Sequence, residues 1–239
     1  MLLILHRVLP DQPLLLAANR DELLDRPSSP PGLRDARIRV LCPHDKRAGG
    51  TWLGVNARGL VAALTNRADT RDDPSRASRG LLPLLALEQH SKSADAADAV
   101  RRELRLRPRN GFRLLLADAE QAVLVAGDGA ASEIVPLSGE VALWTNEWGP
   151  EQADLAPVQG VLTAAAGQLE PLLEGLRGLL RGPGFVKPPR QVGEHSYGTV
   201  SSSLLVVARA HPAGSRLEYA AGRPDQTAYA NYSNLFRRL

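Results

Sequence analysis

The chain has 239 residues, of which 44% are hydrophobic, so it is long enough to bury a substantial core as one large domain or two small ones. Its formal net charge is only +3, and the arginines are spread along the sequence instead of forming one block. This pattern is typical of a solvated surface, and we expect no nucleic-acid partner.

The N-terminal segment and the cysteine content predict the cellular compartment of the protein. The apolar opening Met1–Leu5 is soon interrupted by His6, Arg7 and Pro10, far short of the roughly 20 apolar residues that a membrane span requires. No basic region precedes it, so we expect neither a signal peptide nor a transmembrane segment. Cys42 is the only cysteine, which excludes an internal disulfide and fits a reducing compartment. We expect a cytoplasmic protein.

The first third reads as two hairpins. Apolar runs at 2–9 and 14–18 flank Pro10-Asp11-Gln12-Pro13, which favours a turn, and the second run leads into the polar residues Asn19–Glu22. Residues 27–39 are rich in proline, serine and arginine and are predicted to form a surface loop. Strand-like segments at 51–55 and 59–64 follow, joined by a turn and ending in Thr65-Asn66-Arg67.

The middle of the chain predicts a polar, mobile segment at 69–79, then two helices. The first covers 81–89, and the second runs from 94 to about 106 with Ser93 as its cap. A meander of short antiparallel strands is expected at 112–117, 122–126, 134–137 and 141–145. Residues 152–181 are helical in pattern, and Pro171 should break or kink the helix.

The last strands are expected at 200–208 and 217–220. Strands at both ends with helices between them favour an α+β layered architecture. Because no internal repeat and no convincing linker divide the chain, we treat residues 1–239 as one domain.

Several sequence blocks resemble the NRDE family, also called the transport and Golgi organisation protein 2 family. Their order and spacing resemble the family's, and they span nearly the whole chain. The blocks are Ala17-Ala18-Asn19-Arg20-Asp21-Glu22, Asp25-Arg26-Pro27, Ala48-Gly49-Gly50-Thr51-Trp52-Leu53-Gly54 and Tyr197-Gly198-Thr199.

The resemblance implies a fold of the N-terminal nucleophile hydrolase superfamily, four layers αββα with two stacked antiparallel sheets between helical layers. In such hydrolases the first mature residue supplies both the nucleophile and, through its α-amine, the base. The family pattern opens Met-Cys, whereas this chain has Leu2, which carries no atom that can attack a carbonyl. We therefore assign no catalytic residue and lean against an enzyme; an active protein would be an amide (C–N) hydrolase.

A second departure lies near the C-terminus. The family block resembles Tyr-Gly-Thr-Arg-Ser-Ser, and this chain has Val200 at the position of the arginine. A basic residue there can hold a thiolate or a substrate anion beside the nucleophile. Loss of a thiol and of a candidate cationic partner together favours drift away from hydrolysis.

The candidate ligand-binding residues are residues of this chain that match the family's motifs or lie at the ends of predicted strands. Asp21 corresponds to an aspartate that orients the terminal amine in related amidases, and Asn146 resembles their oxyanion-hole asparagine. For Arg20 and Asp21, a structural role as a buried ion pair is an equal alternative. Asparagine also often follows a strand simply because it is favoured in turns. The full set is Asn19, Arg20, Asp21, Glu22, Trp52, Asn66, Asn146 and Thr199.

We expect no bound metal and no cofactor. Cys42-Pro43-His44 contains soft ligands, but one such tripeptide is weak support for metal or haem ligation. Trp52 and Trp144 could line a hydrophobic pocket, although aromatic residues in strands more often belong to the core.

Three hypotheses for function follow. The first is a non-catalytic binder or trafficking factor for a small apolar ligand with a polar head, of haem or acyl-lipid type. The second is an amide hydrolase or acyltransferase with an unusual nucleophile. The third is a scaffold for protein partners whose cleft is filled.

Overall fold

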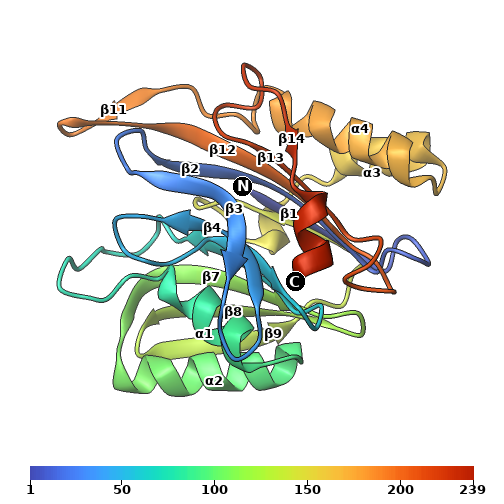
Figure 1. Ribbon diagram of the computed structural model, residues 1–239. Coiled ribbons are helices and arrows are strands. Elements are labelled where there is room, and N and C mark those ends of the chain that lie inside the picture. Colours follow the sequence, from blue (N-terminus) through green and yellow to red (C-terminus); the bar gives the residue numbers. More distant parts are fainter.

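The computed structural model describes residues 1–239 and contains two antiparallel sheets packed face to face (Figure 1). The first sheet has the order β10-β1-β2-β12-β13-β14, with β11 added to β12. Its strands are β1 (Leu2–His6), β2 (Leu14–Leu23), β10 (Val141–Trp144), β11 (Arg190–Val192), β12 (His195–Val207), β13 (Arg216–Ala220) and β14 (Ala230–Asn231).

The second sheet follows the chain in simple order, β3 to β9. Its strands are β3 (Ser28–Arg34), β4 (Val40–Asp45), β5 (Leu53–Asn56), β6 (Val61–Asn66), β7 (Arg109–Ala117), β8 (Ala122–Gly129) and β9 (Ala131–Pro136). The helices are α1 (Leu81–Gln89), α2 (Ser93–Leu106), α3 (Ala156–Ala165) and α4 (Leu169–Arg181), with short 3₁₀ turns η1 (Pro150–Gln152) and η2 (Ser233–Arg238).

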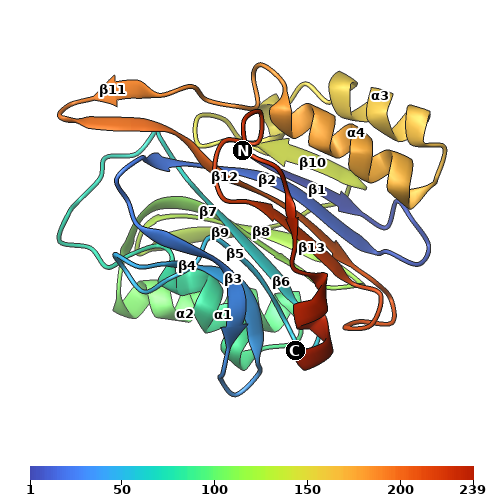
Figure 2. The same cartoon turned by 45° about the horizontal axis from the view of Figure 1, so that its top comes forward.

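Helices cover the outer face of each sheet, which confirms the four-layer αββα fold. Helices α3 and α4 lie over the first sheet, and α1 and α2 lie under the second (Figures 1 and 2). Strand β1 shows why both faces need cover. Leu2 and Ile4 join the core between the sheets, whereas Leu3 and Leu5 pack under α3 and α4. A continuous apolar run is therefore buried on both sides. No helix is long and apolar enough to span a bilayer.

The segment Gly49-Gly50-Thr51, just before β5, packs against the residues that precede α1. Gly49 has a φ of +73°, a conformation that side chains disfavour. A Cβ on Gly50 would lie 2.4 Å from the carbonyl carbon of Gly80, so only glycine permits this close approach. The next residue, Thr51, donates its backbone N–H to the Gly80 oxygen at 2.9 Å. This contact places the residues just before α1 beside Trp52.

One expectation at the edge of the second sheet was wrong. Residues 28–34 form β3, where we predicted a surface loop over residues 27–39. Strand β4, at residues 40–45, was not predicted. Pro30 and Pro31 fall where the register between the two strands shifts, between Ser29 and Gly32. Since β3 is an edge strand, it tolerates prolines that a central strand would exclude.

Three further expectations need correction. Residues 141–144 do form a strand, β10, but it pairs with β1 in the first sheet instead of continuing the β7–β9 meander. Pro171 lies in the first turn of α4, where it is tolerated, and the helical run breaks at Ala166 and Gly167, which both have positive φ. Ser93 is the first residue of α2 and makes no capping hydrogen bond.

Candidate functional site

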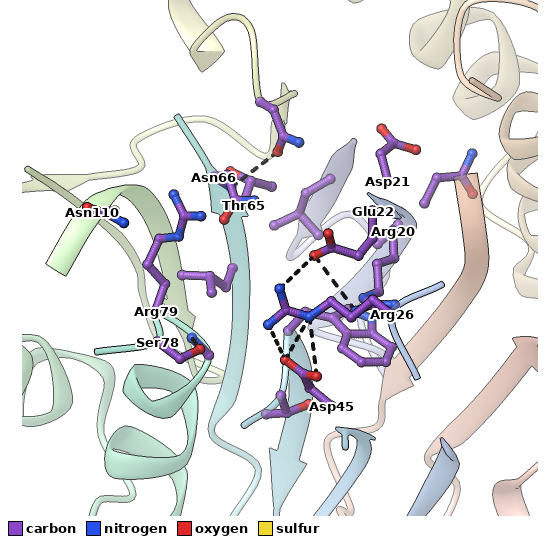
Figure 3. A pocket seen from close by; sticks show the side chains of 18 of the residues that line it. Arg20, Asp21, Glu22, Arg26, Asp45, Thr65, Asn66, Ser78, Arg79 and Asn110 are labelled. Atoms are coloured by element: carbon purple, nitrogen blue, oxygen red, sulfur yellow. Dashed lines mark hydrogen bonds and ion pairs between the residues drawn. The ribbon is translucent and has the colours of Figure 1, made fainter. Parts of the chain in front are cut away.

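A cleft of about 260 Å³ opens at the ends of β2 and β6, between the two sheets (Figure 3). Of its 21 lining residues only six are hydrophobic, and four are arginines. The segment before α1, expected to be mobile, forms one wall with Ser78 and Arg79, and β2 forms another with Arg20 and Glu22. The cleft is therefore a polar, charged site.

Successive residues of the Asn19–Glu22 motif have different surroundings because side chains alternate along a strand. Arg20 and Glu22 lie on the side of β2 that faces the second sheet, with Arg20 stacked on Trp52. Asn19 and Asp21 have their contacts with α4, the segment that follows it, and β12. The motif thus serves two networks.

Asn19 supports the helical layer. Its carboxamide nitrogen donates to the oxygens of Leu180 and Phe185, both at 2.9 Å. Leu180 lies in the last turn of α4, where backbone carbonyls lack partners within the helix. Asn19 Oδ1 is buried and has no hydrogen-bond partner. Although Asn19 also lines the cleft, its donor capacity is used by the protein.

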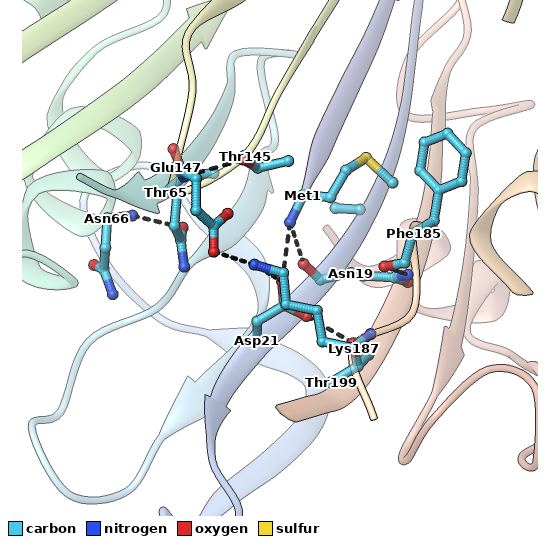
Figure 4. A network of polar contacts seen from close by, with 12 residues as sticks. Met1, Asn19, Asp21, Thr65, Asn66, Thr145, Glu147, Phe185, Lys187 and Thr199 are labelled. Atoms are coloured by element: carbon cyan, nitrogen blue, oxygen red, sulfur yellow. Dashed lines mark hydrogen bonds and ion pairs between the residues drawn. The ribbon is translucent and has the colours of Figure 1, made fainter. Parts of the chain in front are cut away.

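Asp21 is the centre of a buried polar network (Figure 4). Its Oδ1 accepts a hydrogen bond from the Thr199 hydroxyl at 2.7 Å. Its Oδ2 lies 3.6 Å from the α-amine of Met1, which in turn donates to the Asn19 backbone oxygen at 2.9 Å. Burial lowers the pKa of this amine, and the neighbouring Asp21 opposes the effect. Thr199 is 1% exposed and lies outside the cleft lining, so it positions Asp21.

Lys187 brings a positive charge to this network that sequence reasoning missed. Its ammonium lies 3.9 Å from Asp21 Oδ2 and forms an ion pair with Glu147. Burial raises the pKa of Glu147, but the hydrogen bonds from Lys187 and Thr145 outweigh it and lower the pKa overall. A cation therefore stands beside Asp21 despite Val200, contrary to the loss we expected. Nothing in the sequence around Lys187 signals this role.

Arg26 and Asp45 form the strongest ion pair of the cleft. Two nitrogens of Arg26 donate to Asp45 Oδ2, at 2.6 and 3.2 Å, and a third lies 3.6 Å from Glu22. The side-chain hydrogen bond from Arg26 lowers the pKa of Asp45 against the effect of burial. Arg26 belongs to the matching block Asp25-Arg26-Pro27, which was the available signal for its importance.

Asn66 and Asn146 are brought together from the two sheets. The Asn66 backbone N–H donates to Asn146 Oδ1 at 3.2 Å, and Asn146 Nδ2 donates to the Tyr197 hydroxyl at 3.0 Å. Both asparagines line the cleft. Trp144 is fully buried and donates to the Thr65 hydroxyl at 3.1 Å, so it belongs to the core, whereas Trp52 lines the cleft.

Leu2 is one of the few hydrophobic residues that line the cleft. Its side chain is 1% exposed and packs in the core between the sheets. It lies close to the motif strand and to the residues before Asn146, because Leu2 pairs with Ala18 on one side and with Trp144 on the other. This position offers the cleft a hydrocarbon surface and no nucleophile.

The αββα layers and the polar cluster beside β1 define the fold of the N-terminal nucleophile hydrolases. Among the solved structures that are similar to this chain, two that match most of its length are a hydrolase and an amidase. A mutant of conjugated bile acid hydrolase from Clostridium perfringens has a TM-score of 0.57 and 13% identity over 98% of this chain and 93% of its own. The Caenorhabditis elegans N-acylethanolamine-hydrolyzing acid amidase ortholog has a TM-score of 0.53 and 13% identity over 86% and 92%. At such identities the likeness concerns the fold alone.

The sequence places the chain more closely. The profile of the family described as Transport and Golgi organisation 2 matches residues 1–153, and the chain belongs to this family. The mouse homolog is 38% identical over 108 residues, which cover 44% of this chain and 38% of the relative. The bovine homolog is 36% identical over 129 residues, covering 52% and 46%. The chain thus aligns with less than half the length of these relatives.

Proposed function

We propose that this protein binds a small ligand in the cleft between its two sheets without hydrolysing it. The observation that carries the proposal is the combination of an open cleft with Leu2 in its lining, at the sequence position where the family pattern has its cysteine nucleophile. Asn19, Asp21 and Thr199 then serve as supports, while Arg20, Glu22, Trp52, Asn66 and Asn146 meet the ligand. The cytoplasmic location expected from the cysteine content belongs to the same proposal.

The size and polarity of the cleft narrow the mode of binding. At about 260 Å³ it is slightly smaller than the roughly 300–1,000 Å³ of typical small-molecule sites. It therefore suits the polar head of a ligand of haem or acyl-lipid type, with the apolar part lying outside over the rim. The open volume also argues against a scaffold with a filled cleft.

A ligand screen tests this proposal. Native mass spectrometry and thermal shift are applied to the protein with haem, an acyl-CoA and a bile acid. A ligand at 100 times its Kd stabilises a protein by about 2.7 kcal/mol, which for a chain of this size raises Tm by about 5–11 °C. Ala77→Trp, which places bulk at the cleft wall, should abolish the shift. Ala119→Trp, on the exposed β7–β8 turn, is the matched control.

The alternative function is amide hydrolysis or acyl transfer with an unusual nucleophile. It is favoured by one observation, the buried α-amine of Met1 beside Asp21 in a cleft that Asn146 also lines. Incubation with generic amide and thioester substrates, followed by intact mass measurement, separates the two functions. A covalent adduct or steady turnover would establish the alternative, and their absence would remove it.

A further inference from the structure

Arg20 differs from every other arginine that lines the cleft. The guanidinium groups of Arg26, Arg76 and Arg79 each donate hydrogen bonds to carboxylates or backbone carbonyls. The side chain of Arg20 makes no hydrogen bond to the protein, although it is only 8% exposed and carries five N–H donors. A buried guanidinium without acceptors is costly, so its environment calls for an additional partner.

The carboxylates near Arg20 make their hydrogen bonds with other groups. Glu22 Oε2 lies 3.8 Å from Arg20, beyond hydrogen-bond distance, and 3.6 Å from Arg26. Glu22 Oε1 accepts the backbone N–H of Leu23, and Asp45 is held by Arg26. Burial lowers the pKa of Arg20, and the nearby carboxylate of Glu22 only partly opposes this. Arg76 and Arg79 pair with carboxylates outside the lining, those of Asp73, Asp128 and Asp72, so Arg20 is the lining arginine whose charge has no carboxylate within hydrogen-bond distance.

Trp52 holds the Arg20 guanidinium in a defined plane. The guanidinium carbon lies 4.2 Å from the centre of the indole ring, within the range of a cation–π contact. Stacking occupies a face of the guanidinium and leaves donors at its edge, the geometry in which arginine binds carboxylate or phosphate with two parallel hydrogen bonds. Arg20 is therefore ordered before any ligand arrives.

The opposite wall has the same electrostatic sign. Arg79 and Gly80 lie just before α1, and this helix has no acidic residue in its first turn. The start of a helix carries partial positive charge, and here it lies beside Arg79, whose guanidinium is paired with Asp72 at 3.2 Å (Figure 3).

We propose that the head group bound in this cleft is an oxyanion, a carboxylate or a phosphate, recognised by the edge of the Arg20 guanidinium. This inference rests on the proposed function, because it specifies the chemistry of the same ligand.

Four probes separate the charge from the apolar part: octanoate, octyl phosphate, octanamide and inorganic phosphate. Calorimetry with the full chain should give tighter binding of octanoate and octyl phosphate than of uncharged octanamide. Arg20→Met should weaken binding of the anions by about 10- to 100-fold and of octanamide by less than about 2-fold. The exposed Arg101→Met on α2 is the matched control.

Two more variants keep the test informative if Arg20→Met fails to fold. Arg20→Lys keeps the positive charge but loses the paired N–H donors of the guanidinium, and this variant should bind the anions with intermediate affinity. Glu22→Gln removes the competing carboxylate and should tighten anion binding. Phosphate binding as tightly as octyl phosphate would identify a free anion as the ligand class and support the inference, whereas a requirement for the octyl chain would support it with a lipid-like ligand.

Equal binding of octanoate and octanamide, with no effect of Arg20→Met, would overturn the oxyanion inference and leave the proposed binding function intact. Binding of none of the four probes, together with no response to haem, acyl-CoA or bile acid, would overturn both.

Discussion

Replacing Asn19 by alanine tests whether the motif asparagine supports the fold. The substitution removes two hydrogen bonds of 2.9 Å, to the oxygens of Leu180 and Phe185, and leaves both carbonyls without their side-chain donor. Each such bond contributes about 1 kcal/mol, and an unsatisfied buried carbonyl raises the cost toward about 1–3 kcal/mol. Removing the unpartnered Oδ1 offsets a small part.

We therefore expect Asn19→Ala to lower the free energy of unfolding by about 2–4 kcal/mol. At about 2–4 °C per kcal/mol for a chain of this length, Tm should fall by about 4–16 °C. Urea denaturation followed by circular dichroism measures the change. Hydrogen exchange should locate the weakening at the end of α4.

Asn66→Ala is the control, because the Asn66 side chain makes no hydrogen bond and only its backbone N–H contacts Asn146. It should change the free energy of unfolding by less than about 0.5 kcal/mol. If Asn19→Ala and Asn66→Ala were equally stable, the supporting role of Asn19 would be refuted.

Three further predictions follow from other parts of the structure. Gly50→Ala should destabilise the fold by about 1–3 kcal/mol or more, measured by thermal unfolding, because the added Cβ would lie 2.4 Å from the Gly80 backbone. The control is Gly160→Ala on α3, where a Cβ meets open space; this variant should be slightly more stable than the original chain. Glu147→Gln should destabilise the fold at pH 7 but not at low pH. The pKa of Glu147 is lowered in the folded state, so the ionised side chain stabilises the fold above about pH 4.5, and this stabilisation is lost as the pH falls through the folded-state pKa. Equal effects at both pH values would contradict this. Burial raises the pKa of the Cys42 thiol to about 11, so a thiol reagent at pH 8 should react only after unfolding in urea.

The corrections to the predicted elements share one cause. A strand pattern is local, but the partner that a strand chooses is not. β10 was recognised as a strand, yet pairing of Trp144 with Leu2 requires two segments that are far apart in the chain. β3 escaped recognition because its prolines are tolerated only at an edge, and being an edge is a property of the assembled sheet.

The candidate site divides in the same way. The motif blocks indicated the residues Asn19–Glu22 and Trp52, and the Thr-Asn pairs at two strand ends indicated Asn66 and Asn146. All of these line one cleft, whereas the predicted Thr199 does not. Site residues that have no recognisable motif around them in the sequence were not predicted. Lys187 reaches Asp21 because the segment after α4 is hydrogen-bonded to Thr199 of β12, the strand that pairs with β2, and no spacing rule relates the two positions.

Local physical chemistry determined the layered α+β class and the two hairpins of the first third of the chain, because apolar periodicity and turn preferences act between neighbours in sequence. The division of the Asn19–Glu22 motif between two networks was decided by tertiary structure. Asp21 meets Thr199 across 178 residues, and Arg20 has no hydrogen-bond acceptor while Arg26 donates to Asp45 and Leu23 donates to Glu22. Such pairings depend on strand register and on competition for partners, which exist only once the sheets have assembled.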